Sequence, residues 1–163
     1  MLETPALTEM NRSPLGRRIE VLLVEDSAAQ VRLMREAFRD INDSVILHHV
    51  SDGGDAMDFL RQQRSYTAAP RPDLILLDLN LVKMHGQEVL ACIKSDPDLK
   101  MIPTIILTSS DLAADVAYCY ERQANCYLRK PTQYEAYQRL VGSINDFWLT
   151  QVTLMQRAAT TET

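Results

Sequence analysis

The strongest constraint on the fold is a regular alternation between two kinds of segment along the chain. Short apolar runs typical of buried strands recur five times, near residues 19–24, 44–50, 74–78, 102–110 and 125–131. Each run is followed by a segment with the periodicity of an amphipathic helix, and Ser27 is placed to cap the first of these helices. Strands that alternate with helices over short connections favour a parallel sheet with helices on both faces. We therefore predict an α/β fold with a five-stranded, doubly wound parallel sheet.

The composition argues against several classes of protein. The chain has 163 residues, of which 46% are hydrophobic and 24% are charged, and this is enough apolar material for one domain with a core. A net charge of −5 argues against binding to nucleic acid or to a membrane surface. No apolar run approaches the roughly 18 residues of a membrane-spanning helix. Cys92, Cys119 and Cys126 are odd in number and widely spaced, so we expect reduced thiols in a cytoplasmic protein.

The sequence divides into one domain with a short segment on either side. Residues 1–18 contain two prolines, lack sustained periodicity and are expected to form a flexible leader. We assign residues 19–149 to the folded domain and residues 150–163 to a C-terminal extension. The apolar pattern continues in the stretch FWLTQVTLM, which begins at Phe147, so part of the extension is expected to meet a partner. The last eight residues are expected to be disordered.

Chemically active side chains stand at the predicted carboxyl ends of four strands. Asp78 is the least expected of them, because it interrupts an apolar run and an isolated buried carboxylate is energetically costly. The others are Glu25 and Asp26 after the first strand, Thr108 after the fourth and Lys130 after the fifth. The carboxyl ends of parallel strands share one edge of the sheet, where ligands bind in folds of this kind. We therefore expect these groups to converge.

The converging groups predict a site for a phosphoryl group. Three neighbouring carboxylates raise one another's pKa values unless a cation joins them, and Mg²⁺ suits oxygen ligands and also bridges to phosphate. With Lys130 as a fixed positive charge and Thr108 as a hydrogen-bond donor, Asp78 would be the nucleophile. Each residue also has an ordinary explanation on its own, since acidic residues start many helices and Lys130 could be a solvated loop charge. It is the joint pattern that favours a phosphoryl site.

The chain resembles the receiver domains of two-component response regulators. The resemblance rests on the stretches LLVEDS, LILLDLNL, HGQEVL, IILTSS and YLRKP, in that order, and covers about residues 19–149. It implies a flavodoxin-like receiver fold and a signalling protein rather than an enzyme, in which Asp78 takes a phosphoryl group from a histidine kinase. It also implies that Mg²⁺ or Mn²⁺ is held by Glu25, Asp26, Asp78 and the backbone carbonyl of Asn80.

The same resemblance assigns roles to the remaining site residues. Thr108 and Lys130 match the phosphate-contacting hydroxyl and lysine, and Tyr127 matches an aromatic switch residue that turns inward when the acceptor is phosphorylated. The switch is expected to change the surface formed by the fourth helix, the fifth strand and the fifth helix. By the same resemblance, the bond between Lys130 and Pro131 is expected to be a cis peptide.

A narrower resemblance is to the small stand-alone regulators that partner cyanobacterial phytochromes. It rests on the stretches SDPDLKMIPTIILTSS and INDFWL. It implies a phytochrome kinase as partner and a homodimer formed in part by the last helix and the C-terminal extension. The same end of the chain is rich in aromatic residues, which are enriched in interface cores. We expect an interface that includes Tyr118, Tyr137, Phe147 and Trp148.

Two positions depart from the receiver pattern, and both lie in the loop after Asp78. Val82 stands where receivers commonly carry proline, and His85 where they commonly carry aspartate. These differences keep open a phosphorylation-independent receiver that acts through its dimer face. An aspartate-nucleophile phosphohydrolase has less support, because Asn80 cannot serve as its general acid. A nucleotide- or flavin-binding module also has less support, because the Gly-rich turn of such a site is missing after the first strand.

Overall fold

The computed structural model of the protein describes residues 15–156, and it contains one five-stranded sheet. All strand pairs are parallel, and the order across the sheet is β2-β1-β3-β4-β5. The strands are β1 (Ile19–Val24), β2 (Val45–Val50), β3 (Leu74–Leu77), β4 (Thr104–Thr108) and β5 (Cys126–Arg129). The predicted doubly wound α/β fold is confirmed.

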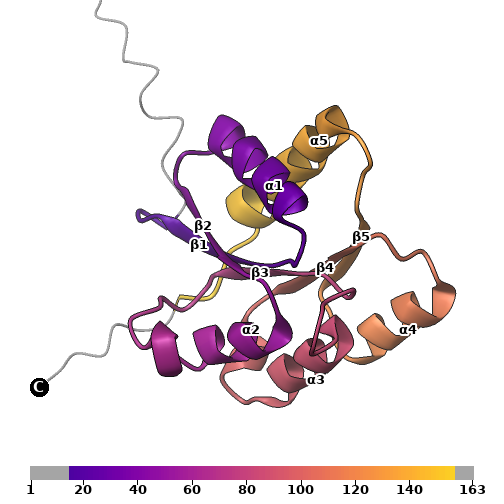
Figure 1. Ribbon diagram of the computed structural model, residues 1–163. Coiled ribbons are helices and arrows are strands. Elements are labelled where there is room, and N and C mark those ends of the chain that lie inside the picture. Colours follow the sequence, from indigo (N-terminus) through magenta and orange to yellow (C-terminus); the bar gives the residue numbers. More distant parts are fainter. Residues whose placement is uncertain (1–14, 157–163) are drawn as a thin grey trace, which may run out of the picture.

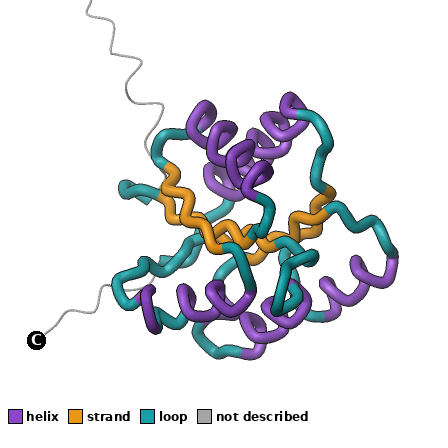
Figure 2. Tube along the Cα trace, viewed as in Figure 1, coloured by secondary structure: helices purple, strands orange, loops and turns teal. Residues whose placement is uncertain are grey.

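Helices cover both faces of this sheet, as Figures 1 and 2 show. One face carries α1 and α5, which pack against each other, and the opposite face carries α2, α3 and α4. The helices are α1 (Ala28–Ile41), α2 (Gly53–Leu60), α3 (Gly86–Ser95), α4 (Ala113–Glu121) and α5 (Tyr134–Ile144). Short 3₁₀ turns follow α2 and α3, and a π-helical segment, Asn145–Gln151, continues α5. Ser27 caps α1 as predicted, because its side chain accepts a hydrogen bond from the backbone N–H of Gln30.

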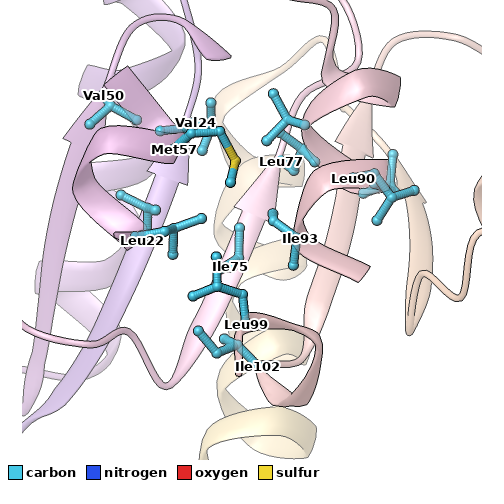
Figure 3. Packing of buried hydrophobic residues seen from close by; sticks show 14 of the residues in the cluster. Leu22, Val24, Val50, Met57, Ile75, Leu77, Leu90, Ile93, Leu99 and Ile102 are labelled. Carbon is cyan, nitrogen blue, oxygen red and sulfur yellow. The ribbon is translucent and has the colours of Figure 1, made fainter. Parts of the chain in front are cut away.

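The sheet separates two apolar clusters, because successive strand residues point to opposite faces. Leu22 and Ile75 face α2 and α3, where they pack with Ile93 and other buried side chains (Figure 3). Leu23 lies in the other cluster, with Phe38 of α1 and residues of α5. The central strands β1, β3 and β4 are almost wholly buried, which explains their unbroken apolar runs.

The described ends of the chain meet at the amino edge of the sheet. Arg17 forms a two-pronged ion pair with the buried Asp73, with N···O distances of 2.6 and 2.9 Å, just before β1 and β3 begin. Leu15 packs with the cluster under α1 and α5, and it lines one pocket together with Leu149 and Leu154. Both of these leucines are buried. Most of the leader, residues 1–14, and the tail from 157 to 163 lie outside the described residues.

Two further observations concern the backbone. All peptide bonds in residues 15–156 are trans, so the expectation of a cis bond between Lys130 and Pro131 is wrong. The trans form is also the lower-energy isomer of an ordinary X–Pro bond. Over the same residues, no helix combines the length and the apolar character that crossing a membrane requires.

Candidate functional site

Asp78 lies at the point where β3 reaches the carboxyl edge of the sheet. The four residues before it are fully buried, and its own backbone N–H continues the ladder by donating to the carbonyl of Val24 at 3.1 Å. The register pairs Val24 with Leu77, so Glu25 and Asp78 emerge from neighbouring strands side by side. The side chains of Glu25 and Asp78 are each 3% exposed. The strand order therefore places two buried carboxylates next to each other.

Lys130 bridges these two carboxylates. Its backbone N–H donates to the carbonyl of Thr108 at 2.8 Å, which fixes the residue at the end of β5. Its Nζ then donates to Asp78 Oδ2 at 2.8 Å and to Glu25 Oε2. Burial alone would lower the pKa of Lys130, but the hydrogen bonds to Asp78 and Glu25 outweigh it and the pKa is raised. The ammonium group is therefore a fixed positive charge within the site.

The acidic cluster consists of Glu25, Asp26 and Asp78, which each offer a carboxylate oxygen within 4.8 Å of the others. With all three carboxylates ionised, one lysine leaves an excess of two negative charges. The pKa of Glu25 is raised to about 7, mainly because the carboxyl group is buried; the hydrogen bond to Lys130 and its charge oppose this rise, and the charge of Asp78 adds to it. Glu25 and Asp78 are buried, whereas Asp26 is exposed. An all-oxygen, electron-rich site with one open side fits a hard divalent cation that keeps some of its waters.

Asn80 and Thr108 complete the site around the Asp78 carboxylate. The backbone N–H of Asn80 donates to Asp78 Oδ1 at 3.1 Å, and its side-chain amide donates to the hydroxyl of Thr108 at 3.3 Å. Thr108 is fully buried at the end of β4. Both oxygens of Asp78 are thus held, one by Asn80 and the other by Lys130. The strand-end residues predicted from the sequence converge at this edge of the sheet.

Tyr127 belongs to a polar network beside the site that the sequence did not reveal. Its hydroxyl donates to the carbonyl of Ser110 at 2.9 Å. The Ser110 hydroxyl donates to Asp115 Oδ2 at 2.5 Å, and the Gln87 side chain donates to the other oxygen of Asp115 at 2.9 Å. Ser110 follows a strand end and could have been selected on that ground. Gln87 and Asp115 lie on different helices, and only the packing of α3 against α4 brings them together.

The loop after Asp78 is held from two sides despite its departures from the receiver pattern. Val82 is exposed and lies at the surface. Lys83 adopts a left-handed backbone conformation, with φ of 68°, and its Nζ pairs with Asp52 Oδ2 at 3.1 Å. His85 is exposed and makes no side-chain cap at the start of α3. The next residue, Gly86, donates its backbone N–H to the carbonyl of Leu79 at 3.1 Å and closes the loop.

The predicted interface residues fall into two groups. Phe147 is 54% exposed and meets the half-buried Trp148 edge-to-face, with ring centroids 5.5 Å apart. Tyr118 is half-buried beneath the guanidinium of Arg122. Tyr137, by contrast, is 3% exposed and packs in the cluster under α1 and α5. The expectation that Tyr137 offers surface to a partner is wrong, because its side chain fills the core of its own domain.

Comparison with known proteins assigns the family. Residues 21–141 match the model of the response regulator receiver domain. The chain belongs to this family. Response regulator Rcp1 from Synechocystis sp. is 48% identical over 134 residues, which cover 82% of this chain and 91% of Rcp1. The probable methanogenesis regulatory protein FilR2 from Methanothrix harundinacea is 36% identical over 129 residues, which cover 79% of this chain and 83% of FilR2.

Solved receiver structures share the fold of this receiver. The Mn²⁺-bound form of Rcp1 superposes with a TM-score of 0.80 at 47% identity, over 85% of this chain and 99% of that one. The phosphorylated cyanobacterial phytochrome response regulator RcpA gives a TM-score of 0.82 at 43% identity, with the same coverage. The expected resemblance to receivers, and to phytochrome response regulators among them, is confirmed. The acidic cluster of this receiver is consistent with the divalent metal site that the family implies.

Proposed function

We propose that this response regulator accepts a phosphoryl group on Asp78 from a sensor histidine kinase. An oxygen of Asp78 attacks phosphorus, an acyl phosphate bond forms, and the bond between phosphorus and the imidazole nitrogen of the kinase histidine breaks. The observation that carries the proposal is the position of the carboxylate. It lies at the end of a buried strand with Lys130 at 2.8 Å on one oxygen and the Asn80 N–H at 3.1 Å on the other. In this proposal the protein is a signalling protein that accepts the phosphoryl group on its own Asp78, rather than an enzyme that acts on a separate substrate.

Each neighbour of Asp78 has a defined task in this transfer. Lys130 provides a buried positive charge for the phosphoryl oxygens, and the Thr108 hydroxyl, whose oxygen accepts from the Asn80 amide, keeps its O–H as a hydrogen-bond donor. Glu25, Asp26, Asp78 and the carbonyl of Asn80 would hold Mg²⁺ or Mn²⁺, which neutralises charge on the phosphoryl group when it is bound. The protein's own contribution is to orient the nucleophile and to place positive charge and donors around it.

The response to phosphorylation is proposed to pass from Thr108 to Tyr127. Movement of the Thr108 hydroxyl toward the phosphoryl group pulls on the β4–α4 loop, and the Ser110 carbonyl of that loop already accepts the Tyr127 hydroxyl. A change at Ser110 therefore reaches β5 directly and alters the surface of α4, β5 and α5. The exposed Phe147 and the adjoining Trp148 support a homodimer as the form that reads this change.

The proposed kinase partner is a phytochrome. This is supported by the likeness to RcpA, a cyanobacterial phytochrome response regulator that is 43% identical to this chain. We place the protein in the cytoplasm, where its three thiols, all free in the described structure, would stay reduced. We propose neither nucleic acid nor a membrane as a partner.

The test is phosphorylation by a small phosphodonor. The purified protein is incubated with acetyl phosphate and Mg²⁺, and intact mass is recorded for the wild type, for Asp78→Asn and for Asp73→Asn. Asp73 is a matched control, since it is a buried aspartate at the other end of β3. One phosphoryl adduct is expected on the wild type and on Asp73→Asn, and none on Asp78→Asn or without Mg²⁺. An unmodified wild-type protein that is folded would contradict the proposal.

A further inference from the structure

His49 makes a hydrogen bond that reaches the backbone of the acidic cluster. It lies near the end of β2, opposite Leu23 of β1, and its Nε2 is 2.7 Å from the backbone carbonyl of Glu25. A carbonyl oxygen can only accept, so this ring nitrogen carries the proton and donates it. The side chain is partly buried at the contact. An edge strand thereby contacts the loop that supplies two of the three carboxylates.

The backbone of Glu25 is held by β2 on both of its polar groups. Its N–H donates to the carbonyl of Val50 at 3.1 Å, and its carbonyl accepts from His49. The Glu25 carbonyl belongs to the peptide unit that joins Glu25 to Asp26. The orientation of this peptide unit decides where the side chain of Asp26 begins, so the His49 bond acts on Asp26 as well as on Glu25.

The position of the Asp26 carboxylate depends on the backbone more than the positions of the other two carboxylates do. Glu25 is fixed through its side chain by the N–H of Ser27 and by Lys130, and Asp78 is fixed by Asn80 and Lys130. The carboxylate of Asp26 is exposed and has no hydrogen-bond partner within residues 15–156. Only the loop backbone keeps it within 4.8 Å of the other two ligand oxygens. Of the three carboxylates, Asp26 is therefore positioned only indirectly, through the backbone of its loop.

We propose that His49 is a positioning residue for the divalent metal site. By donating from Nε2 to the Glu25 carbonyl, it fixes the Glu25–Asp26 peptide and keeps the Asp26 carboxylate aimed at the cation. The inference rests on the proposed function, because it takes the acidic cluster as the metal site. Partners that orient ligands in this way are worth about 10- to 100-fold in metal affinity.

The neighbouring residue provides a matched control. His48 is also a partly buried imidazole of β2, and its Nε2 pairs with Glu20 Oε2 at 2.5 Å while its ring packs on Phe59. Glu20 lies near the start of β1, at the opposite end of the strand from the acidic cluster. Loss of the His48 bond therefore removes another imidazole Nε2 contact from β2, here to a side-chain carboxylate, without touching the loop of Glu25 and Asp26.

The experiment measures Mn²⁺ affinity from the free-ion signal in electron paramagnetic resonance. The variants are His49→Phe, His49→Ala, His49→Gln and His48→Phe, each checked for folding by circular dichroism and thermal unfolding. Phenylalanine keeps the ring volume without a donor, and glutamine restores an N–H donor at nearly the position of Nε2. We expect the Kd for Mn²⁺ to rise about tenfold in His49→Phe and His49→Ala. His49→Gln should stay near the wild type, and His48→Phe should match it even if it unfolds at a lower temperature.

Equal Mn²⁺ affinity in His49→Phe and the wild type would overturn the role of His49, as would equal weakening in His49→Phe and His48→Phe. If His49→Ala does not fold, His49→Phe and His49→Gln decide the question. Mn²⁺ binding and phosphorylation of the wild type separate this inference from the proposed function. A folded wild type that neither binds Mn²⁺ nor takes a phosphoryl group would overturn the proposed function. A wild type that does both, with an unaffected His49→Phe, would overturn only the positioning role.

Discussion

Gly86 lies so close to the acceptor's backbone that a larger residue does not fit. A Cβ atom at this position would lie 2.0 Å from the carbonyl oxygen of Asp78 and 2.6 Å from the Cα of Leu79. Both neighbours are backbone atoms, so neither can rotate away as a side chain could. The glycine in the HGQEVL stretch is therefore required by the close approach of α3 to the loop that carries the acceptor.

Replacing Gly86 with alanine should destabilise the fold and shift Asp78. We expect a loss of about 1–3 kcal/mol in the free energy of unfolding, as for overpacked sites, together with slower phosphorylation. The control is Gly142→Ala in α5, where a Cβ would meet nothing closer than 4.0 Å. That change should stabilise the protein by about 0.5–1 kcal/mol. Urea unfolding of both variants checks the pair, and a Gly86→Ala protein as stable as the wild type would contradict the argument.

The three thiols should differ in reactivity. Cys119 is fully buried, and burial raises the pKa of its thiol to about 11. At about pH 8 the folded protein should therefore be alkylated at the half-buried Cys92 and Cys126 well before Cys119. Because the folded pKa exceeds the ordinary value, Cys119 leaves stability unchanged below about pH 9 and lowers it as the pH rises toward 11. Peptide mass mapping during iodoacetamide treatment gives the order, and rapid modification of Cys119 in folded protein would refute it.

Some site residues could be predicted from their own sequence context, whereas others depend on contacts with distant parts of the chain. Asp78 could be predicted because a carboxylate at the end of an apolar run demands a partner, and Glu25 and Lys130 followed from their places at other strand ends. Tyr137 could not be assigned correctly, because an aromatic residue on an amphipathic helix has the same pattern whether it faces its own core or a partner. The hydrogen bond of His49 was also not predictable, since its acceptor is the backbone carbonyl of Glu25, in the loop that follows β1.

At the scale of elements, Asp52 connects α2 to the loop that follows the acceptor. Its side chain accepts the N–H of Asp55 at 2.9 Å, which caps α2, and also pairs with Lys83, whose side chain is 76% exposed. The hydrogen bond from Asp55 is the main cause of the lowered pKa of Asp52; burial opposes it and Lys83 adds to it. The cap should matter more than the ion pair, because exposed pairs contribute little.

Two single substitutions separate the cap from the ion pair. Asp52→Ala should cost about 1 kcal/mol of unfolding free energy, whereas Lys83→Ala should change it by less than about 0.5 kcal/mol. A carboxylate with a lowered pKa stabilises the fold above its ordinary pKa, and this contribution is lost as the pH falls. The deficit of Asp52→Ala should therefore be constant above about pH 5 and shrink as the pH falls below the ordinary aspartate pKa of about 4. Urea titrations at several pH values test this, and a larger cost for Lys83→Ala would reverse the ranking.

Element types followed from the alternation in the sequence, but several boundaries did not. The fourth apolar run begins at Ile102, yet the N–H of Ile102 closes a turn by donating to Leu99, and β4 starts only at Thr104. The last helix continues beyond α5 as the π-helical segment Asn145–Gln151. Apolar periodicity cannot distinguish a π-helical turn from an α-helical one over so few residues, because the two differ mainly in hydrogen bonding.

At the scale of the whole molecule, the C-terminal segment is shared between the core and the surface. The sequence predicted that its apolar residues need a partner, but Leu149 and Leu154 are 1% and 4% exposed and are covered by the chain's own core. Phe147, on the same π-helical segment as Leu149, is 54% exposed. The segment therefore contributes to folding through one side and is available for association through the other.

Leu149→Ala should act mainly on folding, whereas Phe147→Ala should act mainly on association. Leu149→Ala should cost about 2–5 kcal/mol of unfolding free energy, because it opens a cavity in the core. Phe147→Ala should cost about 1 kcal/mol or less, mainly the edge-to-face contact with Trp148, and should weaken the proposed dimer. Urea unfolding and sedimentation velocity measure the two effects. A Phe147→Ala protein that dimerises like the wild type would remove Phe147 from the interface.

The meeting of both described chain ends at the amino edge has a practical consequence. Met155 lines a pocket with Pro72 and Pro103, just before β3 and β4 begin, and Arg17 lies beside the start of β1. Asp78 lies at the opposite, carboxyl end of β3. A fluorophore or surface tether joined next to residue 15 or residue 156 would thus leave the approach to the acceptor open. Immobilised protein could report kinase encounters in real time without its attachment competing for the face being probed.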